Sequence, residues 1–208
     1  MNVSTLRMVR MAVWAAVVIL AAVVVWVVVI DRNGGSGGNI GQTIVGQTIG
    51  GPFTLTDTNG QTVTEADLQG HPSALFFGYT FCPDVCPTTL SDITVWLQDL
   101  GADADKVKFY FITVDPERDT REQMAAYLTA FDPRIEGLTG SRAAIDQIIK
   151  DYRVYARKVP GKGDDDYTMD HTASIYLLDA RAQFFGTVDY QEKDETVLAK
   201  LRRLMASS

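Results

Sequence analysis

Hydrophobic and polar positions divide the chain into stretches of different character. Residues 11–30 form an uncharged apolar run of about 20 residues, which as a helix is long enough to cross a hydrocarbon core of about 30 Å. Residues 31–51 are rich in Gly and carry almost no charge, as in a flexible tether. The sequence therefore predicts a short N-terminal segment (1–10), a transmembrane signal anchor (11–30), a linker (31–51) and one folded domain (52–208).

The apolar run is expected to remain in the mature protein. A cleaved signal peptide usually has a shorter apolar segment followed by a small-residue cleavage site, whereas this run ends in VVVIDRN. Arg7 and Arg10 precede it, so the positive-inside rule places the N-terminus in the cytoplasm or matrix and the domain outside. The ten residues before the run leave no room for an Arg- and Ser-rich transit peptide. We expect a single-pass protein of a bacterial inner membrane with its domain in the periplasm.

Strand and helix patterns alternate within the domain. Residues 53–68 alternate apolar and polar positions around Asn59-Gly60, which is a hairpin signal. Continuous apolar runs predict buried strands at 73–80 and 107–114, a short strand is expected at 135–138, and strands 173–179 and 182–188 are predicted to form an antiparallel hairpin at the sheet edge. Helical spacing and caps predict helices at about 87–100, 120–131, 142–151 and 192–205.

Strands that alternate with helices imply a sheet covered on both faces. The order of elements predicts an α/β, thioredoxin-like fold, in the peroxiredoxin-like variant that has an added N-terminal β-hairpin. Residues 160–170, PGKGDDDYTMD, are expected to form a polar loop. In that loop, Met169 and the acidic run 164–166 are interpreted as solvated residues rather than metal ligands.

Charge and cysteine content restrict the function. The chain has 19 basic and 26 acidic residues, and without Arg7 and Arg10 the formal charge changes from −7 to −9. A nucleic acid is not expected as a partner, because phosphate binding needs a basic face. Cys82 and Cys86 are the only cysteines, so they belong to no larger disulfide framework. In an oxidising compartment such a pair is either a redox couple or a metal site.

The two cysteines lie in the motif FCPDVCP, between a predicted strand and a predicted helix. A helix N-terminus favours negative charge and lowers thiol pKa values. One helical turn would separate the two Cα atoms by roughly 6 Å, which suits a disulfide and equally suits two thiolates on one ion. A purely structural disulfide is disfavoured, because closing so small a loop stabilises a fold only weakly.

His171 precedes the predicted strand 173–179. In a thioredoxin-like fold the loop before that strand lies beside the cysteine motif. Two thiolates and one imidazole form a three-coordinate set that suits Cu(I), whereas zinc needs a fourth ligand. Asp170 is expected either to hydrogen-bond the second ring nitrogen of His171 or to cap the turn. His71, before a predicted strand, is interpreted as structural.

Three separated motifs carry a resemblance to a known family: GYTFCPDVCP (78–87), VDPERDT (114–120) and DHTASIYLLD (170–179), together with IGGPFTLTD at the start of the domain. In these residues the chain resembles the SCO/SenC family of copper-binding, thioredoxin-like assembly factors for cytochrome c oxidase. The resemblance covers about residues 49–205 and the single N-terminal anchor. Arg121, where a proline is common, and the acidic loop before His171 depart from the family pattern without touching a ligand.

The resemblance implies a function. Cys82, Cys86 and His171 would bind a copper ion received from a donor protein. The protein would then deliver copper to the binuclear centre of oxidase subunit II or a similar acceptor, or reduce the cysteines of that centre. VDPERDT itself is interpreted as a strand end and helix cap.

Three functions therefore remain open. The first is a copper metallochaperone, which binds and transfers the ion and is not an enzyme. The second is a membrane-anchored thiol-disulfide oxidoreductase, in which Cys82 or Cys86 attacks a partner disulfide and His171 tunes the thiol pKa values. Ala173 weakens this hypothesis, because a thioredoxin strand carries a cis-proline there. The third, a peroxiredoxin-like peroxidase suggested by Thr80, is disfavoured because a peroxidatic cysteine needs a nearby Arg and no second cysteine four residues on.

Overall fold

The computed structural model of the protein describes Trp14, residues 49–163 and residues 166–207. The chain divides into two units, residues 1–46 and residues 47–208. Among the described residues, no helix is long and apolar enough to span a membrane. The predicted N-terminal segment, the anchor apart from Trp14 and the linker before Ile49 lie outside the described residues, so they stay predictions.

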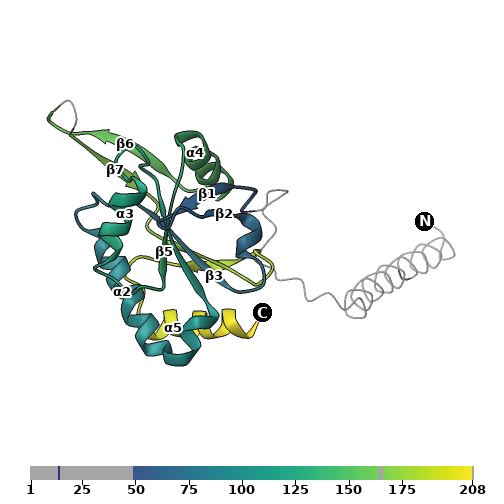
Figure 1. Ribbon diagram of the computed structural model, residues 1–208. Helices are drawn as coiled ribbons and strands as arrows, with labels where there is room; N and C mark the ends of the chain where they lie inside the picture. The colour runs from purple at the N-terminus through teal and green to yellow at the C-terminus, as the bar shows by residue number, and fades with distance from the viewer. Residues whose placement is uncertain (1–13, 15–48, 164–165, 208) are drawn as a thin grey trace, which may run out of the picture. The chain divides into compact units, whose positions relative to one another are not determined.

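The domain is built on a seven-stranded sheet with the strand order β2-β1-β5-β4-β3-β8-β9 (Figure 1). β3, β4 and β5 pair in parallel, whereas the hairpins β1–β2 and β8–β9 extend the sheet on either side by antiparallel pairing. The strands of this sheet are β1 (Thr54–Asp57), β2 (Thr62–Thr64), β3 (Ser73–Gly78), β4 (Lys108–Thr113), β5 (Ile135–Thr139), β8 (Ile175–Leu178) and β9 (Phe184–Val188).

Helices connect these strands close to the predicted positions, although α2 begins at Val85 rather than at about residue 87, so Cys86 lies in its first turn and not ahead of it. The long helices are α2 (Val85–Leu100), α3 (Arg121–Leu128), α4 (Arg142–Asp151) and α5 (Asp194–Ala206), and the short 3-10 helices are η1 (Glu65–Leu68) and η2 (Gly101–Lys106). Thr120 caps α3 as predicted, because its side chain accepts a hydrogen bond from the backbone of Gln123 at 3.2 Å. The thioredoxin-like α/β fold with an N-terminal hairpin is therefore confirmed for the domain.

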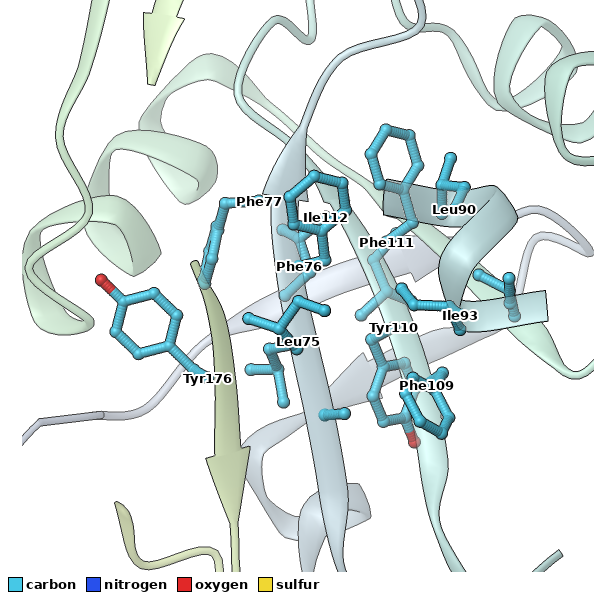
Figure 2. Close-up of a cluster of buried hydrophobic side chains, with 14 of the residues drawn as sticks. Leu75, Phe76, Phe77, Leu90, Ile93, Phe109, Tyr110, Phe111, Ile112 and Tyr176 are labelled. Atoms are coloured by element: carbon cyan, nitrogen blue, oxygen red, sulfur yellow. The ribbon is translucent and has the colours of Figure 1, made fainter. Parts of the chain in front are cut away.

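β3 is a continuous apolar run because both of its faces are buried in the core. All six residues of β3 are buried, and alternate side chains point to opposite faces of the sheet. Phe76 packs against Phe111 of β4 on one face, whereas Phe77 packs edge-on against Tyr176 of β8 on the other. Figure 2 shows Leu90 of α2 beside Phe111, and Phe77 beside Tyr176. Both faces are thus covered, as expected for a mainly parallel sheet.

A second, two-stranded sheet replaces the polar loop predicted at 160–170. It consists of β6 (Ala156–Pro160) and β7 (Tyr167–His171) and projects from the body of the domain (Figure 1). This hairpin could not be predicted from the sequence, because β6 is mostly exposed and therefore lacks the alternation of apolar and polar residues that indicates a strand. The expectation that Met169 is solvated is wrong, since its side chain is buried in the core. Asp166 is exposed as expected, and residues 164–165 lie outside the described residues.

The core assignment predicts the effect of two substitutions on the same helix. Leu97 is fully buried on α2, whereas Val95 is 46% exposed. Leu97→Ala should lower the free energy of unfolding by about 2–5 kcal/mol, because it leaves a cavity. Val95→Ala should change it by about 0.5 kcal/mol or less. Urea titration of both variants checks this, and equal effects would contradict the packing described for α2.

Candidate metal centre

The candidate metal centre lies where β3 ends and β8 begins. These two strands are antiparallel neighbours, with Phe76 opposite Ile175. The loop that carries Cys82 follows β3, and β7, which ends at His171, comes shortly before β8. The sulfur atoms of Cys82 and Cys86 and a ring nitrogen of His171 lie within 4.8 Å of one another. The structure thus brings together all three residues that the sequence predicts as ligands.

A buried carboxylate holds the cysteine loop. Asp119 accepts hydrogen bonds from the backbone nitrogen of Thr80 at 3.0 Å and from the hydroxyl groups of Thr80 and Thr113, both at 2.6 Å. Burial raises the pKa of Asp119, and these three donors act against that shift. β3 ends at Gly78, before the predicted residue 80, because the N–H group of Thr80 donates to Asp119.

Gly78 leaves the space that Cys86 occupies. A Cβ atom at position 78 would lie 2.7 Å from the Cys86 sulfur and 2.7 Å from the ring of Phe111. Real side chains do not tolerate such distances, so any larger residue would displace the sulfur or the ring. The buried position of Cys86 at the start of α2 therefore depends on the absence of a side chain at Gly78.

The two thiols have different environments. Cys86 is fully buried, whereas Cys82 is half-buried in the loop. Hydrogen bonding from the Cys86 thiol holds the pKa of Cys82 well below its usual range. The same hydrogen bond, together with burial, raises the pKa of Cys86. The backbone N–H group of Cys86 also donates to the Cys82 sulfur at 3.4 Å. In the reduced, metal-free pair, the more exposed Cys82 is therefore the thiol that ionises more readily.

His171 presents one ring nitrogen to the sulfur atoms. Its Nδ1 lies 3.0 Å from the carbonyl oxygen of Thr172, and its Nε2 lies 3.4 Å from the Cys86 sulfur. Because a carbonyl oxygen only accepts, we assign the proton to Nδ1, which leaves a lone pair on Nε2. The ring of Tyr79 packs edge-on against the imidazole, with centroids 5.8 Å apart. The imidazole is thus oriented with Nε2 toward the sulfur atoms.

Neither role predicted for Asp170 is observed. Its carboxylate forms an ion pair with Arg157 across the β6–β7 hairpin at 3.2 Å, because the extended strand directs it away from the imidazole. The carbonyl group of Thr172 takes the expected place beside the ring. His71 lies at the opposite end of β3, where its Nδ1 contacts the Pro72 carbonyl and the Ser73 hydroxyl at 3.4 Å. It is outside the three-residue group, as the sequence predicts.

The segment VDPERDT contributes more to the site than a strand end and a cap. Asp119 anchors the cysteine loop, and Arg118 lies against the aromatic side chains of that loop. Sequence analysis missed both roles, because the residues of the cysteine loop that they contact, Tyr79, Thr80 and Phe81, lie 37 or more positions away along the chain. The one signal in the sequence was that charged residues follow directly after a buried strand. Such residues are usually solvent-exposed, so this signal alone did not indicate a role in the site.

Comparison with known proteins decides the family. The family model described as SCO1/SenC matches residues 41–206 of the chain. The chain belongs to the SCO1/SenC family. "Protein SCO2, mitochondrial" of Saccharomyces cerevisiae is 40% identical over 159 residues, which is 74% of this chain and 52% of that protein. The chain therefore spans only about half the length of this SCO relative.

Two copper-bound SCO structures are similar to this one. Bradyrhizobium japonicum ScoI with copper bound is 54% identical and matches with a TM-score of 0.71, over 75% of this chain and 99% of that chain. Yeast Sco1 with copper bound is 35% identical and also has a TM-score of 0.71, over 77% of this chain and 90% of that chain. The thioredoxin-like domain is therefore shared with other SCO proteins.

The unequal burial of the two thiols predicts unequal reactivity. In the reduced, metal-free protein at neutral pH, iodoacetamide should modify Cys82 at least about tenfold faster than Cys86, because Cys82 is both more exposed and ionised. Mass spectrometry of the two modified peptides over time measures this ratio. In urea the two rates should become similar. Equal rates in the folded protein, or a faster Cys86, would contradict the assignment.

Proposed function

We propose that the protein is a copper metallochaperone that binds one copper ion through Cys82, Cys86 and His171. The convergence of two sulfur atoms and one imidazole nitrogen within 4.8 Å carries the proposal. The copper bound by similar SCO proteins supports it. The family resemblance extends it to assembly of the binuclear copper centre of cytochrome c oxidase subunit II, with copper supplied by a donor protein.

The donor set suits Cu(I) better than other common ions. Soft thiolates favour Cu(I), and three donors complete a trigonal site, whereas zinc prefers four. The described Asp, Glu, Cys and His side chains offer no fourth member to this group. Binding would remove the proton that Cys86 keeps in the metal-free pair, so copper uptake should release it.

The geometry also suits transfer of the ion. Cys82 is the more exposed sulfur, so a ligand from an acceptor protein would reach the ion from the side of the cysteine loop. Cys86 and His171 hold their places through buried packing and a fixed ring orientation. Ligands would then be exchanged one at a time, beginning at Cys82.

We also propose that the domain acts on the outer face of a membrane. The apolar run 11–30 would anchor it as a single-pass helix, and Arg7 and Arg10 would keep the N-terminus inside. The linker 31–51 would let the domain 52–208 reach a membrane-bound acceptor. A bacterial inner membrane, with the domain in the periplasm, fits this arrangement.

A second function is supported by the unequal thiols. A half-exposed Cys82 thiolate beside a buried Cys86 thiol resembles an attacking and a resolving cysteine. Cys82 would attack a partner disulfide and release one partner thiolate. Cys86, after losing its proton, would attack the mixed disulfide and release the second partner thiolate. The product would be a Cys82–Cys86 disulfide, which an external dithiol would have to reduce.

The two histidines of the chain provide a matched test. His171→Ala in the full-length protein should weaken Cu(I) binding by at least about 100-fold, because it removes the only nitrogen ligand. His71→Ala should change the affinity by less than about twofold, since His71 lies at the other end of β3. Competition with a Cu(I) chelator gives both affinities.

Transfer of copper to an apo subunit II domain and reduction of its oxidised cysteines should be followed in parallel. His171→Ala should abolish transfer while thiol exchange survives, because both cysteines remain. Delivery of copper by this variant at the wild-type rate would instead support the oxidoreductase function. A melting curve for each variant shows whether the fold is intact.

A further inference from the structure

Arg118 joins three segments that meet beside the metal centre. Its Nε forms an ion pair with Asp115 at 2.5 Å, and its Nη1 donates to the backbone carbonyl of Tyr167 at 3.0 Å. The guanidinium carbon lies 3.6 Å from the centroid of the Tyr167 ring, 4.8 Å from that of Phe81 and 5.7 Å from that of Tyr79. One side chain thus contacts residues from both ligand-bearing parts of the chain.

The residues that Arg118 contacts are close to the candidate ligands, either in the sequence or by packing. Phe81 is the residue before Cys82, and Tyr79 packs edge-on against the His171 ring. Tyr167 is the first residue of β7, and His171 is the last. Because β7 is a single extended segment, the position of Tyr167 at its start affects the position of His171 at its end.

The β6–β7 hairpin needs such an attachment. A two-stranded ribbon is at best marginally stable in water, and β6 buries little of its surface. The ion pairs Lys158–Glu117 and Arg157–Asp170 have partners that are each at least half exposed, so they contribute little. Arg118 is only 21% exposed. It is therefore the best-shielded of the cations that link the hairpin to the rest of the site. β7 has two further attachments, since the Tyr167 hydroxyl donates to Asp115 at 2.9 Å and Met169 is buried in the core.

One hydrogen-bond donor of the Arg118 guanidinium group is unsatisfied. Nη2 of Arg118 is buried without a hydrogen-bond partner among the described residues. A buried unpaired donor is unfavourable, so the other contacts of the side chain must account for its presence. The guanidinium group of Arg118 contacts the Tyr167 and Phe81 rings while it also bonds Asp115 and the Tyr167 carbonyl. A Lys ammonium can lie over one ring, as Lys158 does 3.7 Å from the centroid of Tyr167, but it lacks the planar fork that makes all these contacts at once.

We propose that Arg118 is a positioning residue of the metal centre. It fixes the β7 strand, and with it His171, against the loop that carries Cys82. Without the guanidinium group, the two cysteines keep their places through Gly78 and Asp119, whereas His171 is held less firmly opposite them, by Met169 in the core and by the contacts of its ring with Thr172 and Tyr79. The effect on copper binding rests on the proposed function, whereas the effect on the hairpin does not.

Hydrogen exchange in the metal-free, full-length protein tests the structural part. Arg118→Lys should increase the exchange of amides in residues 167–171 about tenfold and leave the core strand 73–78 unchanged. Arg157→Lys is the matched control, because it alters a cation on the same hairpin that makes its ion pair within the hairpin. It should change exchange by less than about twofold. Unchanged exchange of residues 167–171 in Arg118→Lys would overturn the proposal, and Arg118→Leu repeats the test with the charge removed.

A double-mutant cycle tests the effect on the ligand set. Arg118→Lys should weaken Cu(I) binding about tenfold in the wild-type background and less than about twofold in the His171→Ala background, because it acts through His171. An equal loss in both backgrounds would show a general effect on the fold and overturn the proposal. If the wild type bound no copper, the proposed function would fail, and hydrogen exchange would still decide the role of Arg118.

Discussion

β3 and β8 lie side by side in opposite directions, so the end of β3 is next to the start of β8. The chain leaves β3 through the cysteine loop and approaches β8 through β7, and Cys86 therefore meets His171 although 85 residues separate them. Reversal or loss of this pairing would separate the sulfur atoms from the imidazole. The chemistry of the domain thus depends on the hydrogen bonds between two buried strands.

Local contacts then fix each donor within this frame. Gly78 leaves room for the Cys86 sulfur, Asp119 holds Thr80 in the cysteine loop, and the Thr172 carbonyl orients the His171 ring. These contacts involve no metal, so the donors are in place before an ion arrives. Preorganised donors lower the free-energy penalty of ordering a site on binding.

Much of this arrangement could be predicted from the sequence. β3 and β4 are long apolar runs, and the motif FCPDVCP at the end of such a run places two thiols at the start of a helix. The convergence of the three candidate ligands could be predicted because the order of elements fixes which loops meet at one sheet edge. The donor set of two thiolates and one imidazole indicated Cu(I), and family resemblance favoured a metal site over the redox site that the same residues also fit.

Other features could not be predicted, because they depend on contacts between distant residues. β6 and β7 are mostly polar, so backbone pairing rather than apolar alternation defines them, and Met169 is buried within a segment that reads as a loop. Asp170 pairs with Arg157, which only the hairpin register brings opposite it. Arg118 reads as a surface charge, and its contacts with Phe81 and Tyr167 exist only after the sheet forms.

The most direct test of the central claim is X-ray absorption at the copper edge of the Cu(I)-loaded, full-length protein. If Cys82, Cys86 and His171 share one ion, the first coordination shell should contain two sulfur atoms and one nitrogen, and His171→Ala should remove the nitrogen contribution. A shell of two sulfur atoms alone in the wild-type protein, or a four-coordinate shell, would contradict the trigonal site described above.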